Sequence, residues 1–295
     1  WVWVQGAGVS EGRLWGGCIE VLEFLKGSDF WPKKSFWNGG THTGKRFYKM
    51  PIWDNSALHN LYEAEIATWW QGERAITAVS GNIIASWIMN TLRFGQPMNI
   101  GPNNFTLAIP GATIISSSTP HYLQFSTSNA SISSKPEFVI NGAITIGGWF
   151  SVDALQTGEK GIISRGFSTF AQSTHNYGLV WNNNQAHFII NNSAGTNYQT
   201  VTATSTPSIG SWFFIVGRFT PTSEIAIFIN NQKTTVSTTT TLTGQNAGTL
   251  GVGQLGAGFG RLTSGKCQRA WILNTALTDS DIQFMYSNQK GAFGI

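Results

Sequence analysis

A period of two in hydrophobicity runs through the C-terminal part of the chain and restricts its fold more than any other feature. Five segments alternate in this way: 122–126, 144–152, 211–219, 224–230 and 266–273. Neighbouring side chains of a β-strand point to opposite faces of the sheet, so the alternation predicts strands. Asparagine-rich stretches at 182–185 and 230–232 interrupt such segments, and asparagine tolerates the left-handed backbone of tight hairpin turns. Many short strands joined by polar turns predict a β-sandwich or jelly roll.

The first third of the chain has a different character. Nine of the 13 tryptophans and eight of the 14 acidic residues precede residue 113. Apolar residues recur at spacings of three and four over residues 57–70, which predicts a helix. Residues 75–92 carry no charge and form a second helical candidate, whose scattered hydroxyl and amide side chains favour a packed segment over membrane insertion.

These differences predict two parts joined by a linker. Residues 1–95 are expected to form a smaller, tryptophan-rich α+β part. Residues 96–118 contain three prolines together with glycine, asparagine and serine, and are expected to form the linker. Residues 119–295 are expected to form the mainly β sandwich.

Local features of the β part predict how its core closes. Trp149 and Trp212 lie on strand-like segments, where an inward indole can fill the space between two sheets. Thr278 or Asp279 can cap a short closing helix that lies across an open sheet end. The buried residues of this helix are expected to be Ile282, Met285 and Tyr286. The threonine-rich tract 234–243 suits an exposed edge strand.

The scarcity of charge excludes some functions and favours a location. Charged residues make up only 11% of the chain, and the net charge is +4. The sequence lacks the basic stripe of a nucleic-acid-binding protein, so nucleic acid is not an expected partner. Surfaces rich in hydroxyl and amide groups are typical of secreted, cell-surface and virion β-proteins, and we expect an extracellular, cell-surface or virion location.

Four segments of the β part resemble the laminin-G-like, concanavalin A-like jelly-roll family, in the family's order: 144–152, 210–219, 224–232 and 270–286. The first two are similar to tryptophan-containing strands of the family. The third is similar to the next strand and its turn, with Asn231 and Gln232 in place of Asn-Gly. The fourth is similar to the closing strand and its short helix. The resemblance implies a concanavalin A-like jelly-roll sandwich over residues 119–295, and Ca²⁺, which many laminin-G-like modules hold at the sandwich rim, is the one cofactor that it implies.

A short N-terminal stretch, residues 8–38, resembles the S66 LD-carboxypeptidase and microcin-immunity peptidases. Its Gly-Arg-Leu-Trp-Gly-Gly element follows Glu11, and the glutamate at this place in the family belongs to a Ser-Glu-His triad. The family's nucleophilic serine lies on a domain upstream of this element, and His42, His59 and His121 have no family context here. The stretch therefore predicts a peptidase-like remnant or an assembly segment rather than a working peptidase.

Glycosidase activity would require two carboxylates placed across the scissile bond. Glycosidases that share this fold carry a Glu-x-Asp-x-x-Glu pattern, or a close variant, on one strand. In the β part, the acidic residues outside the expected closing helix have no acidic neighbour two residues away: Glu137, Asp153, Glu159 and Glu224. Asp279 and Asp281 are two residues apart, but they lie in that helix. We therefore expect a protein that is not an enzyme and has no catalytic residue.

Carbohydrate binding needs neither a metal nor a catalytic pair, because a sugar stacks its apolar face on aromatic rings and pairs its hydroxyls with amides. The aromatic candidates near the asparagine-rich hairpin are Tyr177, Trp181 and Tyr198. The hydrogen-bonding candidates are Asn182, Asn183, Asn184 and Asn192. Trp181 is the preferred stacking residue, although it shares a strand face with Leu179, so a core position is the alternative. The asparagines alternatively serve as turn formers only.

The sequence offers one candidate residue for a calcium site and two histidines near the hairpin. Asp153 lies near a predicted strand end and is the candidate calcium ligand, with backbone carbonyls and asparagine amides completing the shell. His175 and His187 flank the hairpin, but two histidines without a partner acid or thiol make no convincing zinc site.

The sequence therefore predicts a non-catalytic recognition module that binds a glycan or a protein surface. The alternative is a structural subunit of a virus particle or surface layer, which self-assembles with the jelly roll as its building unit. Abundant tryptophan and scarce charge also favour that alternative, because the cores of protein interfaces are aromatic-rich and charge-poor. A residual peptidase or glycosidase is the third hypothesis.

Overall fold

The computed structural model describes residues 82–93, 96–99, 103, 105–109, 112–115, 120–125, 130–166, 176–191, 199–242, 248–256 and 260–295. The chain divides into two compact units, Trp1–Glu63 and Ala64–Ile295, and every described residue belongs to the second unit. The helix expected at 57–70 and the peptidase-like stretch at 8–38 lie outside the described residues.

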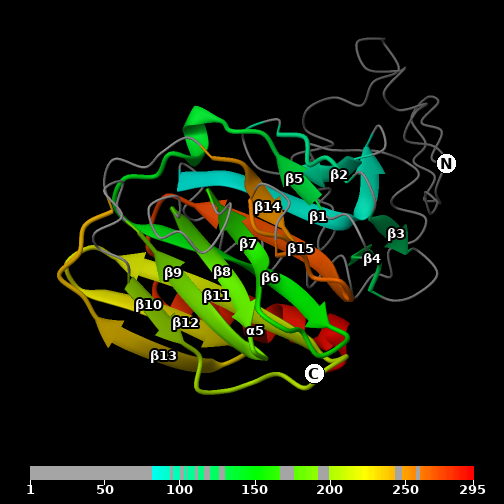
Figure 1. Cartoon of the computed structure of the whole chain (residues 1–295). Coiled ribbons are helices and arrows are strands. Elements are labelled where there is room, and N and C mark those ends of the chain that lie inside the picture. Colours follow the sequence, from blue (N-terminus) through cyan, green and yellow to red (C-terminus); the bar gives the residue numbers. More distant parts are fainter. Residues whose placement is uncertain are drawn as a thin grey trace, which may run out of the picture. The chain divides into compact units, whose positions relative to one another are not determined.

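The described residues form two antiparallel sheets that pack face to face (Figure 1). The larger sheet has nine strands, with the order β13-β12-β11-β6-β15-β1-β2, and β4 and β3 extend it beside β15. Its strands are β1 (Ile83–Arg93), β2 (Gln96–Asn99), β3 (Thr113–Ile115), β4 (Tyr122–Phe125), β6 (Ile144–Val152), β11 (Trp212–Thr220), β12 (Glu224–Ile229), β13 (Gln232–Ser237) and β15 (Gly265–Leu273). The smaller sheet has six strands in the order β10-β9-β8-β7-β14-β5. Its strands are β5 (Ala130–Ile132), β7 (Glu159–Arg165), β8 (Tyr177–Asn182), β9 (Gln185–Ile190), β10 (Gln199–Thr202) and β14 (Leu250–Val252).

The predicted mainly β sandwich is confirmed. Each of the five alternating segments contains a strand, in the order β4, β6, β11, β12 and β15. Both asparagine-rich stretches form hairpin turns, between β8 and β9 and between β12 and β13. Asn183, Asn184 and Asn230 have φ angles of 48°, 64° and 54°, the left-handed conformation that asparagine accepts. The tract expected at an exposed edge begins in β13, which is an edge strand of the nine-stranded sheet.

The helix predicted at 75–92 is wrong for the residues that the structure describes, because Ile83–Arg93 form strand β1. β1 pairs with β15, from Ile83 opposite Leu273 to Ile88 opposite Arg269. An uncharged apolar segment is compatible with a helix or with a buried strand. Here the segment forms a strand because it pairs with β15, which lies near the other end of the sequence. The sandwich therefore begins before residue 119 and takes in β2 and β3 from the expected linker. Within the described ranges, no helix has the length and apolar character needed to cross a membrane.

Apolar side chains from both sheets fill the space between them. Trp181 of β8 lies against Phe213 of β11, with ring centroids 5.5 Å apart. Gly217 of β11 permits close approach of the sheets, because a Cβ atom there would lie 2.3 Å from the Phe188 ring of β9. The two sheets therefore pack closely, because large rings from both sheets contact each other and the absence of a side chain at Gly217 leaves room for the Phe188 ring.

A C-terminal helix covers the outer face of the nine-stranded sheet (Figure 1). Helix α5 (Asp279–Gln289) begins after Thr278, whose hydroxyl accepts a hydrogen bond from the Asp281 backbone N–H at 3.1 Å. The Asp281 carboxylate in turn accepts from the Thr278 N–H at 3.1 Å, which completes a capping box. The short helix η4 (Lys290–Phe293) follows. The predicted cap at Thr278 is confirmed, as are the predicted buried residues Ile282, Met285 and Tyr286.

The two tryptophans expected between the sheets lie on the opposite face. Trp149 is buried beneath the C-terminal helix, where its Nε1 donates to Gln289 Oε1 at 2.6 Å. Its ring stacks on Phe293 with centroids 3.9 Å apart. Trp212 is half-buried on the same outer face, 5.2 Å from the Phe293 ring. The expectation of an inward position is wrong for both, because a shift of one residue along a strand exchanges its two faces.

Candidate functional site

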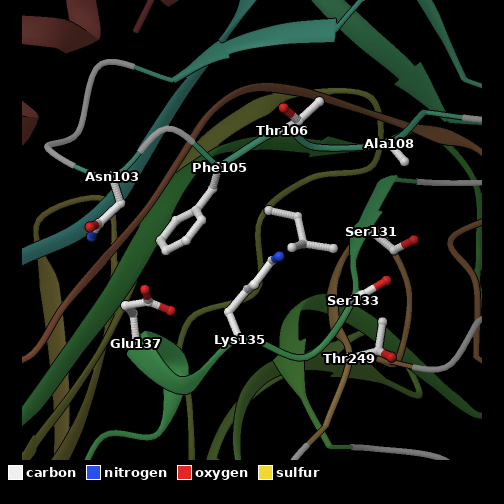
Figure 2. Close-up of a pocket in the computed structure, with 10 residues that line it drawn as sticks. Asn103, Phe105, Thr106, Ala108, Ser131, Ser133, Lys135, Glu137 and Thr249 are labelled. Atoms are coloured by element: carbon white, nitrogen blue, oxygen red, sulfur yellow. The ribbon is translucent and has the colours of Figure 1, made fainter.

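A pocket of about 570 Å³ opens at the β5 edge of the six-stranded sheet (Figure 2). Its walls come from the segment 103–108, from β5 and the turn that follows it, and from Thr249 just before β14. The lining residues are Asn103, Phe105, Thr106, Ala108, Ser131, Ile132, Ser133, Lys135, Glu137 and Thr249.

One wall of this pocket is a strand-like extension of the sheet. The Ala108 N–H donates to the Ser131 carbonyl at 2.9 Å, and the Ser131 N–H donates back to the Ala108 carbonyl at 2.9 Å. The preceding turn is anchored to β1, because the Asn103 side chain donates to the Ile84 carbonyl at 2.9 Å. The position of the segment 103–108 is therefore set by backbone pairing with β5 and by the Asn103 amide, which donates to a backbone carbonyl of β1.

The opposite wall contains the short helix η2 (Pro136–Phe138). Pro136 at its first position suits the fixed φ angle that begins a helical turn. Phe138 is buried, and its ring packs against Phe105 with centroids 4.9 Å apart. Lys135 and Glu137 flank Pro136 and are exposed. Phe138 thus acts as the anchor that presents a cation and a carboxylate at the pocket.

The lining combines groups of complementary chemistry. Thr106, Ser131, Ser133 and Thr249 contribute hydroxyls, and Phe105 contributes a half-buried ring. Figure 2 shows the Lys135 side chain extending into the space between Phe105 and the two serines. Such a set can pair with several hydroxyls, neutralise one acidic group and offer an apolar ring surface.

Two of the aromatic residues proposed as sugar-stacking residues lie in the core. Trp181 is 1% exposed and Tyr177 is fully buried. The Tyr177 hydroxyl donates to the Phe138 carbonyl at 3.1 Å, and burial raises the pKa of Tyr177. Neither ring presents a face to a ligand in this structure, so Trp181 takes the core position that the sequence left as its alternative.

The asparagines of the hairpin do not meet the pocket. Asn182, Asn183 and Asn184 end β8 and form its turn, whereas Tyr177 at the start of β8 lies next to η2. Asn184 Oδ1 accepts from the Gln156 N–H at 3.3 Å, which supports the role of turn former. Asn192 and Tyr198 lie outside the described residues.

The histidines near the hairpin give no metal site in the described part of the chain. His187 Nδ1 lies 2.9 Å from Thr202 Oγ1, and burial lowers the pKa of His187. His175 lies outside the described residues. Among residues that the structure describes, no group of three or more His, Cys, Asp or Glu side chains lies close enough to hold a metal ion.

The surroundings of Asp153 do not fit a calcium site. Asp153 Oδ1 accepts from Ser151 Oγ at 2.5 Å and lies 3.3 Å from Lys266 Nζ. Calcium takes roughly six to eight oxygen ligands. The Lys266 ammonium group lies so close to the Asp153 carboxylate that its positive charge would repel a calcium ion there. In this structure Asp153 is the partner of a lysine, and the expectation of calcium at this residue gains no support from its neighbours.

Two carboxylates that are isolated in the sequence share their partners in the structure. Glu224 and Asp279 each contact both Arg218 and Lys233. Burial raises the pKa of Glu224, but hydrogen bonds from Thr235, Lys233 and Arg218 outweigh it and lower the pKa overall. Burial also raises the pKa of Asp279, but hydrogen bonds from Arg218 and Lys233 and their positive charges outweigh it and lower the pKa overall. A glycosidase pair needs one carboxyl that keeps its proton, and both of these favour the ionised form.

The pocket residues carry little signal in the sequence. Phe105 and Thr106 fall in the expected linker, and Lys135 and Glu137 lie in a polar turn without a motif. The pocket exists because the segment 103–108 pairs with β5, and neither segment has a strong strand pattern of its own.

Comparison with known proteins places the fold. The family model of the concanavalin A-like lectin/glucanases superfamily matches residues 124–283. A search of curated proteins found no match. The peptidase resemblance of residues 8–38 gains no support from the family model or from the similar solved structures.

Several solved structures of toxin binding domains share the fold. One concerns botulinum neurotoxin type C, whose cell entry depends on interaction with two ganglioside molecules; it is 13% identical with a TM-score of 0.56 over 72% of this chain and 53% of that chain. The binding domain of Paraclostridial Mosquitocidal Protein 1 is 12% identical with a TM-score of 0.55, over 70% of this chain and 52% of that one. The binding domain of botulinum neurotoxin DC in complex with rat synaptotagmin II is 15% identical with a TM-score of 0.54, over 72% and 52%. The chain spans about half of the length of these proteins, and at such identities the likeness shows the fold alone.

Proposed function

We propose that this chain, which belongs to the concanavalin A-like lectin/glucanases superfamily, is a non-catalytic recognition module that binds a glycan in the pocket beside β5. The observation that carries the proposal is the lining of this pocket, which joins hydroxyls, one cation, one carboxylate and one aromatic ring. A module of this kind would meet its glycans outside the cell, on a cell surface or on a virion.

The chemistry of the lining favours a sugar over a purely apolar ligand. Serine and threonine hydroxyls and the Glu137 carboxylate can each pair with sugar hydroxyls, and the Phe105 ring can contact a sugar's C–H face. Lys135 adds a charge-assisted partner for an acidic group on the glycan. Proteins of similar fold support this class of ligand. Cell entry of botulinum neurotoxin type C depends on interaction with two ganglioside molecules, and the binding domain of botulinum neurotoxin DC was determined in complex with SialylT.

The lack of a suitable acid pair favours binding without hydrolysis. Glu137 is the single carboxylate of the pocket among the lining residues. Glu224 and Asp279, the acids that share partners, lie on β12 and at the start of α5 and both favour the ionised form. A general acid and a second carboxylate are therefore not brought together within the described residues.

A second candidate function is a structural subunit that self-assembles, and one observation favours it. β13 is an edge strand whose side chains are mostly exposed, and Val236 on it is 45% exposed. An open edge of this kind offers unpaired backbone groups to another strand. Sedimentation velocity over a range of chain concentrations tests it, because a subunit of this kind associates as its concentration rises.

The glycan proposal is tested by a glycan-array screen of the full chain, once with calcium and once with a chelator. We expect binding that survives the chelator, because the residues around Asp153 do not fit Ca²⁺. Lys135→Met should weaken binding to acidic glycans about tenfold through loss of one charge-assisted hydrogen bond. Lys290→Met removes an exposed lysine from η4, away from the pocket, and should leave binding unchanged.

Two outcomes would contradict the proposal. The first is an empty array from a chain whose circular dichroism shows it folded, which would shift the function to assembly or to a protein partner. The second is glycan binding that Lys135→Met and Ser133→Ala leave at the level of the unchanged chain, which would place the site elsewhere.

A further inference from the structure

Three half-buried aromatic rings meet on the outer face of the nine-stranded sheet, beside the C-terminal helix. Tyr122 comes from β4, Trp212 from β11 and Phe293 from η4. The Tyr122 and Trp212 centroids lie 5.8 Å apart at 66°, and those of Trp212 and Phe293 lie 5.2 Å apart at 58°. We call these three residues the aromatic corner, because successive rings stand steeply to one another rather than forming one flat surface.

A charged pair borders the aromatic corner. Lys266 Nζ lies 5.5 Å from the Tyr122 ring centre and 3.3 Å from Asp153 Oδ1. Ser151 is the register partner of both Lys266 and Trp212, so these three residues share one face of the sheet. The register of β11, β6 and β15 therefore holds the cation, a hydroxyl and the indole in one row.

The corner differs from the aromatic cluster under the helix. Trp149 and Phe214 are fully buried there, and their rings serve packing. Tyr122, Trp212 and Phe293 each keep part of their surface in solvent. Within the described residues, the Asp153 carboxylate contacts Ser151 and Lys266 through Oδ1, and its Oδ2 is able to accept further hydrogen bonds.

From this arrangement we infer that the aromatic corner is a second sugar-binding surface, separate from the pocket, which takes a single pyranose ring. The inference takes its ligand class from the proposed function but uses none of the pocket residues. The C–H face of the sugar would lie on an exposed ring face, and its hydroxyls would pair with Asp153 Oδ2 and Lys266. Steep angles between successive rings suit one sugar residue, because an extended chain needs coplanar platforms.

The charged pair argues for a sugar over an apolar partner surface. Covering the corner with apolar side chains would remove water from Lys266 and Asp153, and the hydration that an ion pair loses on burial can exceed the attraction between its charges. Sugar hydroxyls replace that water with hydrogen bonds, so both charges remain solvated. The Asp153 carboxylate then serves as an acceptor held by Ser151 and Lys266, without a metal.

Saturation-transfer difference NMR with the full chain and a panel of methyl pyranosides tests the inference. We expect transfer to at least one methyl pyranoside and an affinity about tenfold weaker in Trp212→Ala. Phe284→Ala is the matched control, since Phe284 is a 46% exposed aromatic residue of α5 outside the corner, and it should bind like the unchanged chain. A chelator should not change the signal.

The pocket and the corner give different outcomes in the same experiment. Loss of binding in Trp212→Ala but not in Lys135→Met would support the corner. For an acidic methyl pyranoside, the class for which Lys135 is expected to matter, the same result would also count against the pocket. Loss in Lys135→Met with full binding in Trp212→Ala would overturn the corner and leave the proposed function in place. Transfer to no methyl pyranoside by the folded chain would overturn the corner.

A milder variant covers the case in which Trp212→Ala does not fold. Asp153→Asn keeps the shape of the side chain and removes its charge, so its melting temperature should stay close to that of the unchanged chain. We expect it to weaken methyl pyranoside binding several-fold, because a charged acceptor binds hydroxyls more strongly than a neutral one. Binding at full strength in this folded variant would contradict the inference.

Discussion

At the scale of single residues, β7 carries an unusual feature, a buried charge at each end. Arg165 is fully buried, and its Nε, Nη1 and Nη2 atoms have no hydrogen-bond partner among the residues that the structure describes. The Tyr177 ring lies 6.0 Å from its guanidinium carbon, and burial lowers the pKa of Arg165. Glu159 is 7% exposed, and burial raises its pKa. A strand of this length separates its ends by about 20 Å, so the two charges do not neutralise each other.

This guanidinium, which lacks a hydrogen-bond partner in the described part of the chain, predicts a stabilising substitution. Arg165→Met removes the charge and keeps most of the apolar volume, and we expect the free energy of unfolding to rise by about 1–3 kcal/mol. Urea unfolding at neutral pH measures the change. Lys135→Met, which removes an exposed charge, is the control and should change stability by less than about 0.5 kcal/mol. A less stable Arg165→Met chain would contradict this prediction.

At the scale of elements, the attachment of α5 to the sheet depends first on its cap. Thr278→Ala removes the hydroxyl that accepts from the Asp281 N–H, and we expect a loss of about 0.5–2 kcal/mol in the free energy of unfolding. Ser287→Ala, an exposed serine of the same helix, should cost nothing measurable. Urea unfolding of the two variants side by side checks the prediction. Equal stability of both would mean that packing of Ile282 and Met285 alone holds the helix.

A charged network forms the second attachment of α5. Arg218 of β11 and Lys233 of β13 both contact Asp279 at the start of the helix and Glu224 of β12. Arg218 also donates to the Leu277 carbonyl at 2.8 Å. The network therefore joins three neighbouring strands to the helix N-terminus.

This network predicts a loss of stability in acid. The folded-state pKa values of Glu224 and Asp279 lie below their ordinary values of 4.5 and 3.8. Each carboxylate therefore contributes stability that is fully present above its ordinary pKa and is lost as the pH falls through the folded-state pKa. We expect the unchanged chain to lose more stability between about pH 7 and pH 3 than Glu224→Gln/Asp279→Asn does. Urea midpoints at both pH values measure this difference, and parallel pH dependences would refute it.

At the scale of the whole molecule, stability depends on the contact between the two sheets. Trp181 lies in that contact against Phe213, and it is 1% exposed. Trp181→Ala should therefore lower the free energy of unfolding by about 3–5 kcal/mol, as large cavities in cores do. Leu155→Ala, at a residue that is 71% exposed, is the control. A Trp181→Ala chain with unchanged stability and lost sugar binding would instead return Trp181 to the role of stacking residue.

The fold was largely accessible from local pattern, whereas the candidate site was not. Alternation in residues 144–152 and 211–219 identifies β6 and β11, and asparagine at 183 and 184 identifies a turn, because both signals are local. The same alternation does not say which face meets the other sheet, so Trp149 was expected on the wrong side. Phe105 and Lys135 are brought together by the pairing of Ala108 with Ser131, which no local signal announces.

Sequence alone therefore determined the class of this protein: a mainly β sandwich with polar turns, a capped closing helix and few charges. These properties follow from the period of side chains along a strand and from the backbone preferences of individual residues. Tertiary structure alone decided that residues 83–93 are a strand, that Trp149 faces the helix and that Trp181 faces the core. It also decided which residues meet at the pocket and at the aromatic corner, because contacts between segments distant in sequence depend on register and packing, which local pattern does not encode.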